Sequence, residues 1–176
     1  MNRAQFIPFV FMLVGGAALG LGQGATETSI KISSPDFSDG GNIPARFTCT
    51  GENVNPSLQI SGVPAVAKSL VIIVDDPDAP TGTWTHWLLW NLKPDLKEIP
   101  VNSVPAGTAQ GVNDFHKNNY SGPCPPSGTH RYFFRVYALD MVLELPASAN
   151  RKALDKAISG HVLAHSEWMG KYAKPK

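Results

Sequence analysis

The hydrophobic positions of the chain fall into short runs that are typical of β-strands. Residues 30–32 and 58–60 alternate apolar and polar side chains and end at Ser, Gly or Pro, which predicts two short strands. Residues 69–74 form a continuous apolar run, the pattern of a strand that is buried on both faces. Residues 84–91 are aromatic and apolar, and residues 130–139 are the longest β-prone stretch. The pattern therefore predicts a mainly β protein.

The C-terminal part of the chain changes to a helical pattern. Asn150 is a favourable N-cap, and the apolar residues within 153–158 recur at helical spacing. After an interruption at Ser159 and Gly160, a second helix is expected from residue 161 to about residue 172. Many strands followed by helices predict a β-sandwich with a helical tail, or an α+β fold.

The N-terminal segment is set apart from the rest by its own pattern. Arg3 precedes an apolar stretch over residues 6–21, and small residues follow up to Ala25, which is the layout of a secretory signal peptide. The alternative is an uncleaved anchor, but the apolar run is shorter than the ~20 residues that a spanning helix needs. We therefore expect a signal peptide over residues 1–25 and one domain over residues 26–176. The mature protein would be periplasmic or secreted, with no transmembrane span.

Composition limits the kinds of partner. The 176 residues suffice for one domain with a sizeable core, and Gly 16 and Pro 15 indicate many turns. Charged residues make up 16% and the formal net charge is +1, so there is no electrostatic basis for binding nucleic acid or an anionic membrane surface. Any bound anion must be held by local geometry.

Three clusters of residues could carry chemistry. An acidic turn over residues 75–80 follows the continuous apolar run, and its structural alternative is a solvated turn whose carboxylates bond to the backbone. His86 lies in the next strand, where a lone histidine is more often a core residue than a ligand. A Pro- and Gly-rich loop precedes His130 and Tyr132, which lie two residues apart and therefore share one strand face.

Together these clusters predict one small polar cavity at the strand ends. His86 and His130 would donate hydrogen bonds to phosphate oxygens, and Tyr132 would add a hydroxyl donor. A nearby carboxylate would orient the imidazoles and favour their charged form. An aromatic rim, Trp84 or Trp87, could cover an apolar or methylated head group.

The sequence contains two cysteines, Cys49 and Cys124. In an exported protein an even number of cysteines suggests a disulfide, and the alternative is two buried free thiols. No CxxC or Cys/His spacing suggests zinc. The sequence indicates neither a metal nor a cofactor.

Three ordered motifs resemble the signatures of the phosphatidylethanolamine-binding proteins, also called Raf kinase inhibitor proteins. They are DPDAP at residues 76–80, HW at residues 86–87 and GPCPPSGTHRY at residues 122–132. The resemblance runs in order from about residue 30 to residue 172. The phrases FTCTGENVNPSL, GVNDF and SGHVLAHSEWMGKY look most like the bacterial and archaeal branch.

This resemblance implies a Greek-key β-sandwich of two antiparallel sheets with C-terminal helices and a shallow anion pocket at one end. The pocket residues that it implies are Asp76, Asp78, Trp84, His86, Tyr120, Gly122, Pro126, His130 and Tyr132. Two positions depart from the family pattern. Cys124 stands where animal members have glycine, and His116 stands where glycine is frequent, for which the sequence gives no reason.

The favoured interpretation is a non-catalytic protein that binds a small phosphate-type anion, a phospholipid head group or a phosphorylated partner. The resemblance implies a kinase- or protease-inhibitor-like regulator, but the known targets of the family do not carry over to an exported protein. A periplasmic inhibitor or a signalling role is therefore the further expectation. The alternative is a metal- or His-dependent hydrolase that uses two His and two Asp of the same pocket, although no HExxH or GxSxG motif is present. A purely structural or adhesive sandwich would leave the histidines without a purpose.

Overall fold

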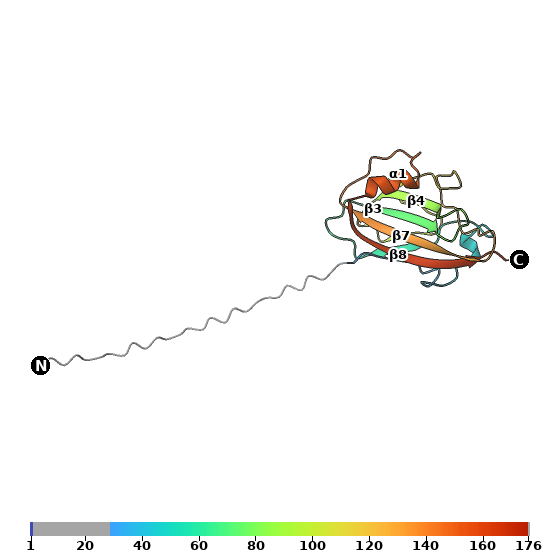
Figure 1. Cartoon of the computed structure of the whole chain (residues 1–176), viewed down its shortest axis with the longest axis horizontal. Coiled ribbons are helices and arrows are strands. Elements are labelled where there is room, and N and C mark those ends of the chain that lie inside the picture. Colours follow the sequence, from blue (N-terminus) through green and yellow to red (C-terminus); the bar gives the residue numbers. More distant parts are fainter. Residues whose placement is uncertain (2–28, 176) are drawn as a thin grey trace.

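The computed structural model describes Met1 and residues 29–175, so the predicted signal peptide lies, apart from Met1, outside the described residues. Two antiparallel sheets form the body of the described domain (Figure 1). The smaller sheet has the strand order β1-β2-β5 and the larger sheet has the order β6-β4-β3-β7-β8. The predicted mainly β class with two antiparallel sheets is confirmed.

The elements are β1 Lys31–Ser33, a 3-10 turn Ala45–Phe47, β2 Leu58–Ser61, β3 Ser69–Asp76, β4 Trp84–Leu92, β5 Glu98–Ile99, β6 Ala109–Gln110, β7 Thr129–Leu139, α1 Arg151–Ile158 and β8 Val162–Ala173. The strands predicted around residues 30, 58, 69, 84 and 130 correspond to β1, β2, β3, β4 and β7. The two-residue strands β5 and β6 are too short to leave a periodic signal in the sequence.

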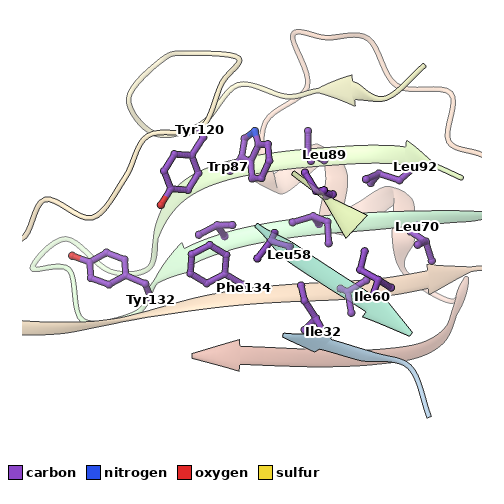
Figure 2. Close-up of a cluster of buried hydrophobic side chains, with 14 of the residues drawn as sticks. Ile32, Leu58, Ile60, Leu70, Trp87, Leu89, Leu92, Tyr120, Tyr132 and Phe134 are labelled. Carbon is purple, nitrogen blue, oxygen red and sulfur yellow. The ribbon is translucent and has the colours of Figure 1, made fainter. Parts of the chain in front are cut away.

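The main core lies between the two sheets (Figure 2). Both faces of β3 are covered, which explains why its sequence is apolar throughout. Leu70 and Ile72 belong to the main core, while Val71 and Ile73 belong to a second cluster on the other face of the larger sheet. Helix α1 covers that second cluster with Leu154 and its neighbours. The strand predicted to be buried on both faces is therefore confirmed, and it fixes β3 at the centre of the fold.

Helix α1 begins as the sequence predicts. The side chain of Asn150 accepts a hydrogen bond from the backbone N–H of Ala153 at 3.1 Å, which satisfies one of the free amides of the first turn. Leu154 and Ile158 are the buried residues of the helix. Within the described part of the chain, no helix is both long and apolar enough to span a membrane.

The prediction of a second helix, from residue 161 to about residue 172, is wrong, because Val162–Ala173 form strand β8. β8 pairs with β7 continuously from Thr129↔Ala173 to Leu139↔Val162, with one irregularity near its start. Its inward positions Ala164, Trp168 and Tyr172 pack on the main core. Gly170 shares this face, and a Cβ there would come within 3.0 Å of Ile43 and Phe37. Backbone pairing with an eleven-residue strand outweighs the local preference for a helix.

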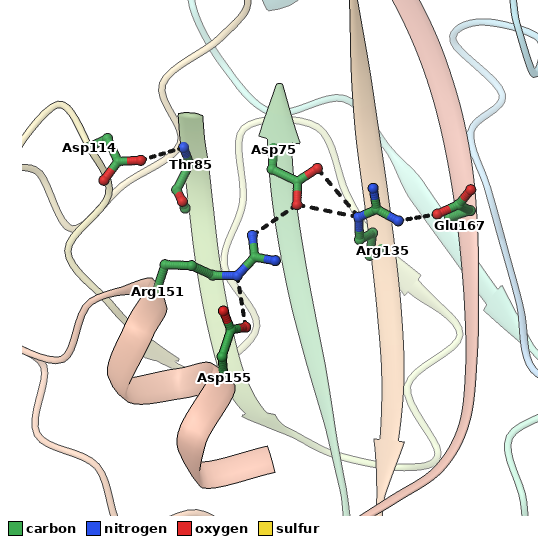
Figure 3. Close-up of polar contacts among 7 residues, drawn as sticks. All are labelled: Asp75, Thr85, Asp114, Arg135, Arg151, Asp155 and Glu167. Carbon is green, nitrogen blue, oxygen red and sulfur yellow. Dashed lines mark hydrogen bonds and ion pairs between the residues drawn. The ribbon is translucent and has the colours of Figure 1, made fainter. Parts of the chain in front are cut away.

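A charge network ties α1 to the outer face of the larger sheet (Figure 3). Asp75 on β3 is 1% exposed, accepts a hydrogen bond from Arg151 Nη1 at 2.8 Å and lies 3.3 Å from Arg135 Nε. Arg151 also bonds to Asp155 at 2.8 Å, and Arg135 pairs with Glu167 of β8. Arg151 is the first residue of α1, where the helix dipole disfavours a cation. Its position is therefore explained by the buried carboxylate of Asp75.

Replacing Arg151 with Ala should lower the free energy of unfolding by about 2–3 kcal/mol. Breaking a buried ion pair costs ~3–5 kcal/mol, and the loss here is smaller because Arg135 still faces the Asp75 carboxylate. Urea unfolding measures the change. Arg46→Ala is the control, because the Arg46–Glu52 pair is exposed and should contribute under ~1 kcal/mol. Equal losses in the two variants would contradict the structural role of the Asp75 network.

Candidate functional site

The predicted clusters meet at one end of the larger sheet. β3 ends in the acidic turn, β4 returns from it beside β3, and β7 starts there because it runs antiparallel to β3. These elements and the loops near residues 115 and 125 enclose a cavity of about 230 Å³. The cavity is lined by Asp76, Ala79, Pro80, Thr81, Trp84, His86, Phe115, Cys124, Pro125, Pro126, His130 and Tyr132. Six of the nine predicted pocket residues therefore line one cavity, namely Asp76, Trp84, His86, Pro126, His130 and Tyr132.

His130 is paired with a buried carboxylate. Its Nδ1 lies 2.7 Å from Asp76 Oδ2, and the two residues are only 7% and 3% exposed. Because a carboxylate accepts hydrogen bonds, Nδ1 carries the proton of this contact. Asp76 also accepts a bond from the backbone N–H of Asp78 at 2.8 Å, so the turn after β3 holds the carboxylate in place. The arrangement orients the His130 ring and leaves Nε2 as its other polar atom.

His86 is held through the same ring nitrogen but by a neutral partner. Its Nδ1 lies 2.5 Å from the backbone carbonyl of Ser121. Burial lowers the pKa of His86, although the Ser121 carbonyl and the nearby Asp76 and Asp75 carboxylates act in the opposite direction. The net direction favours the neutral imidazole. A neutral ring whose Nδ1 donates to this carbonyl would offer Nε2 to a ligand as an acceptor, whereas the sequence led us to expect a donor.

Tyr132 brings an unpaired hydroxyl to the pocket. Figure 2 shows its ring at the edge of the main core, with the oxygen directed away from the aliphatic side chains. The residue is fully buried, and within residues 29–175 no group lies in hydrogen-bond geometry with its Oη. Burial raises the pKa of the phenol, and the nearby Asp76 carboxylate acts in the same direction while the Cys124 backbone acts against it, so the hydroxyl keeps its proton. Both neighbours lie close to Oη but outside hydrogen-bond geometry. A buried donor without a partner is costly, and a ligand oxygen would satisfy it.

The rim of the cavity is aromatic. Trp84 contacts Phe115 edge to face at 5.6 Å between ring centres, and Phe115 contacts His86 in the same way at 5.2 Å. Trp84 is therefore the rim residue. Trp87, the other candidate, is fully buried in the main core and donates to Gln110 at 2.9 Å.

Phe115 was not predicted from the sequence, and the turn that carries it explains the unusual residue at position 116. His116 has a φ of +59°, a left-handed conformation in which glycine is favoured. Asn113 stabilises this turn, since its side-chain oxygen accepts hydrogen bonds from the backbone N–H groups of Phe115 and Lys117 at 3.0 Å. The glycine that the family resemblance led us to expect at this position would therefore suit its backbone conformation.

Three of the predicted pocket residues lie outside the cavity lining and have structural roles. Asp78 pairs with Arg131 at 2.6 Å, and this pairing lowers the pKa of its carboxyl to about 2. Tyr120 donates to the backbone carbonyl of Phe47 at 3.0 Å. The N–H of Gly122 donates to the side chain of Asn53 at 2.8 Å. Through these contacts Asp78, Tyr120 and Gly122 hold the segments that form the walls of the pocket.

Replacing Gly122 with Ala should displace the loop that holds His86. A Cβ at this position would lie within 3.0 Å of the backbone of Phe47 and Thr48, so the loop or this backbone has to shift. We expect a loss of at least about 2 kcal/mol in unfolding free energy, in the range of overpacked sites. Gly128→Ala is the control: its φ is +70° but its Cβ would meet nothing within 4 Å, so only ~1–2 kcal/mol of backbone strain applies. Thermal unfolding of both variants measures the difference, and a smaller loss at position 122 would contradict the close approach.

The loop is also held covalently, because the predicted disulfide between Cys49 and Cys124 is present. The Cα atoms are 5.4 Å apart, and the backbone N–H of Cys49 donates to the carbonyl of Pro123 at 3.1 Å. Cys124 itself lines the cavity. The disulfide therefore joins the segment after the 3-10 turn to a wall of the pocket, at the position where the sequence departs from the animal pattern.

The positions of the possible metal ligands can be compared with those of a metal site. Across residues 29–175, no group of three or more His, Cys, Asp or Glu side chains is placed to hold a metal ion. The Nδ1 atoms of both pocket histidines are engaged by protein oxygens.

Comparison with known proteins identifies the family. The model of the phosphatidylethanolamine-binding protein family matches residues 33–173. A UPF0098 protein of Methanothermobacter thermautotrophicus is 49% identical over 150 residues, covering 82% of this chain and 99% of that protein. The chain therefore belongs to the phosphatidylethanolamine-binding protein family, and it is similar to UPF0098 proteins of archaea and bacteria.

Solved structures agree with this assignment. A phosphatidylethanolamine-binding protein homologue of Chlamydia trachomatis superposes with a TM-score of 0.80 at 38% identity, covering 84% of this chain and 99% of that one. YbcL of Escherichia coli, described as a member of the mammalian family, superposes with a TM-score of 0.79 at 29% identity and the same coverage. The fold and the family are thus established together.

Proposed function

We propose that this protein binds a small phosphate-type anion, free or as part of a larger ligand, in the cavity between the acidic turn and β7. The observation that carries the proposal is the pair of imidazoles on one cavity, each fixed through Nδ1, with the unpaired Tyr132 hydroxyl beside them. Fixed rings lose little freedom when a ligand binds, which favours affinity in a small site. The name of the family, phosphatidylethanolamine-binding protein, supports a phosphate group as the chemistry that the pocket recognises. The lipid in that name is a phosphodiester, so which phosphate ester this chain prefers is a separate question.

The cavity is suited to a group of this size. A volume of about 230 Å³ holds a phosphate and a short substituent but not an acyl chain. The Trp84 and Phe115 rings and the prolines of the rim would contact the substituent. A regulator that captures a phosphorylated segment of a protein target would use the same subsite.

We further propose that the pocket is not catalytic. A hydrolase needs a nucleophile within reach of a base, and among the described residues neither imidazole bonds to a hydroxyl or thiol. The hydroxyl of Ser121 instead accepts from Asn113 at 3.1 Å, and Cys124 is in the disulfide. The Asp76–His130 pair is the one feature that favours the hydrolase alternative. Turnover of a chromogenic phosphate or carboxylate ester that disappears in His130→Ala would establish that alternative.

Export is also a proposal. It is supported by the pattern of residues 1–25 and by the disulfide, since such bonds persist in oxidising compartments. Mass spectrometry of the mature chain from an extracytoplasmic fraction would identify a cleaved N-terminus near residue 25. Recovery of the intact chain from the cytoplasm would contradict it.

The binding proposal is tested by calorimetric titration of the purified protein with inorganic phosphate at neutral pH. We expect saturable binding with one site per chain. The absence of binding up to phosphate concentrations of tens of millimolar, about the weak limit of a specific site, would overturn the proposed function.

A further inference from the structure

The two pocket histidines differ in what they can offer a ligand. The partner of His86 Nδ1 is a backbone carbonyl, which only accepts, so this nitrogen carries a proton whether the ring is neutral or charged. The neutral ring then has a bare Nε2, which is an acceptor. The partner of His130 Nδ1 is the Asp76 carboxylate, which is a counter-charge for a protonated ring, and in that ring Nε2 is a donor.

The surroundings of His86 favour the neutral ring. The residue is 2% exposed, and burial lowers its pKa more than the nearby carboxylates Asp75 and Asp76 on β3 raise it. β7 contributes two rings. The centre of the Tyr132 ring lies 5.2 Å from the centre of the His86 ring, and the His130 ring stacks on Tyr132 with 6.5 Å between their centres. A positive charge on His130 would further disfavour a second charge on His86. The loop side contributes the Ser121 carbonyl, the Gly122 backbone and the Phe115 ring, none of which is ionisable. The two backbone groups raise the pKa of His86, but by less than burial lowers it.

We propose that the pocket selects a phosphate group that still carries a proton, whose P–O–H donates to Nε2 of His86 while its other oxygens accept from His130 and Tyr132. This inference rests on the proposed anion-binding function and narrows its ligand. The occupant is inorganic phosphate or a phosphate monoester in its protonated form. Sulfate and phosphodiesters, including the phosphate of an intact phospholipid, lack the O–H and are disfavoured.

The physical reason is the cost of an unsatisfied contact. An anion without an O–H would place an oxygen lone pair against the bare Nε2 and leave that acceptor desolvated. An unpaired buried polar group typically changes affinity by at least about tenfold. Inorganic phosphate keeps an O–H through the neutral and alkaline range, whereas a monoester loses its only one near pH ~6. The affinities of inorganic phosphate, of a monoester and of an anion without an O–H are therefore expected to depend on pH in different ways.

The first test compares two ligands of matched charge by calorimetry at about pH 5, below the monoester pKa of ~6. Phosphoethanolamine is a monoester and its methyl ester is a diester; both then carry one ammonium and one singly charged phosphate, and they differ only in P–O–H against P–O–CH3. We expect the monoester to bind at least about tenfold more tightly. Equal or tighter binding of the diester would overturn the inference and would instead favour a lipid head group or an ammonium donor to His86.

The second test follows inorganic phosphate, sulfate and phosphoethanolamine from about pH 5 to about pH 8, across the monoester pKa of ~6. Taking ratios to sulfate removes any change of the site with pH that all three anions share. The monoester-to-sulfate affinity ratio should fall by at least about tenfold, while the phosphate-to-sulfate ratio stays high. Sulfate binding as tightly as phosphate at every pH would overturn the proton selection but leave the anion site intact. If no anion binds, the proposed function itself fails.

A substitution at His86 tests whether this residue is the source of the preference for phosphate over sulfate. His86→Gln places an amide, which can donate, near the position of Nε2, so the preference for phosphate over sulfate should shrink by at least about fivefold. Because the ligand comparisons use the unmodified protein, they remain decisive if this variant does not fold. A folded His86→Gln protein with unchanged selectivity would contradict the role of His86.

Discussion

Replacing Cys49 and Cys124 with serine should lower the free energy of unfolding by about 4 kcal/mol, the stabilisation expected for a closed loop of this length in the chain-entropy model. The cysteines are 75 residues apart in sequence, so the bond removes a large part of the freedom of the unfolded chain. For a domain of this size the melting temperature should fall by roughly 10 °C. Calorimetry of the variant and of the oxidised wild type measures both quantities.

Reduction provides the control for this prediction. A reductant should bring the wild-type protein to the stability of the double-serine variant and should leave the variant unchanged. The pocket should loosen as well, because Cys124 lines it and Ser121, three residues earlier, holds His86. A wild-type protein whose melting temperature is the same with and without a reductant would contradict the stabilising role of the disulfide.

Replacing His130 with Ala should weaken phosphate binding at neutral pH by about tenfold or more. The substitution removes a charge-assisted hydrogen bond, which contributes roughly 1.5–3 kcal/mol. It also leaves the Asp76 carboxylate in the pocket without its partner, so the anion would face an uncompensated negative charge. Calorimetric titration of both proteins gives the ratio of affinities, provided that circular dichroism shows the variant to be folded.

His161→Ala is the matched control for His130→Ala. Its Nδ1 lies 2.9 Å from Asp140, so it is also an imidazole paired with an aspartate, but it does not line the cavity and is 43% exposed. This variant should bind phosphate as the wild type does. Equal weakening in both variants would indicate a general electrostatic effect, and unchanged affinity in a folded His130→Ala protein would remove His130 from the site.

The strands with a strong apolar pattern could be predicted from the sequence. The prediction failed for β8, where the spacing of apolar residues fits both a helix and a strand. Ala164, Trp168 and Tyr172 are four residues apart, so they share a face in a helix and also in a strand. Only the pairing with β7, whose residues lie between 23 (Leu139↔Val162) and 44 (Thr129↔Ala173) positions earlier in the chain, decides between the two. The helix α1 could be predicted because its cap and its buried residues are local.

The candidate site was predictable in its residue types but not in its hydrogen bonds. The acidic turn, His86, His130 and Tyr132 stand out in the sequence, and the structure places them around one cavity. The partner of each imidazole could not be predicted, because the contacts of His86 with the Ser121 carbonyl and of His130 with the Asp76 carboxylate join segments that are far apart in the sequence. The supporting roles of Asp78 and Gly122 also depend on contacts between distant segments.

The central claim, that a phosphate-type anion binds between His86 and His130, is tested most directly by nitrogen NMR of the histidine rings at neutral pH. Without phosphate, His86 should show a protonated Nδ1 and a bare Nε2. Added phosphate should shift Nε2 of His86 and of His130 in one saturable step, with no change at His116, His161 and His165, which lie outside the cavity lining. Phosphate that leaves both pocket rings unchanged, or that shifts all five histidines alike, would contradict the claim.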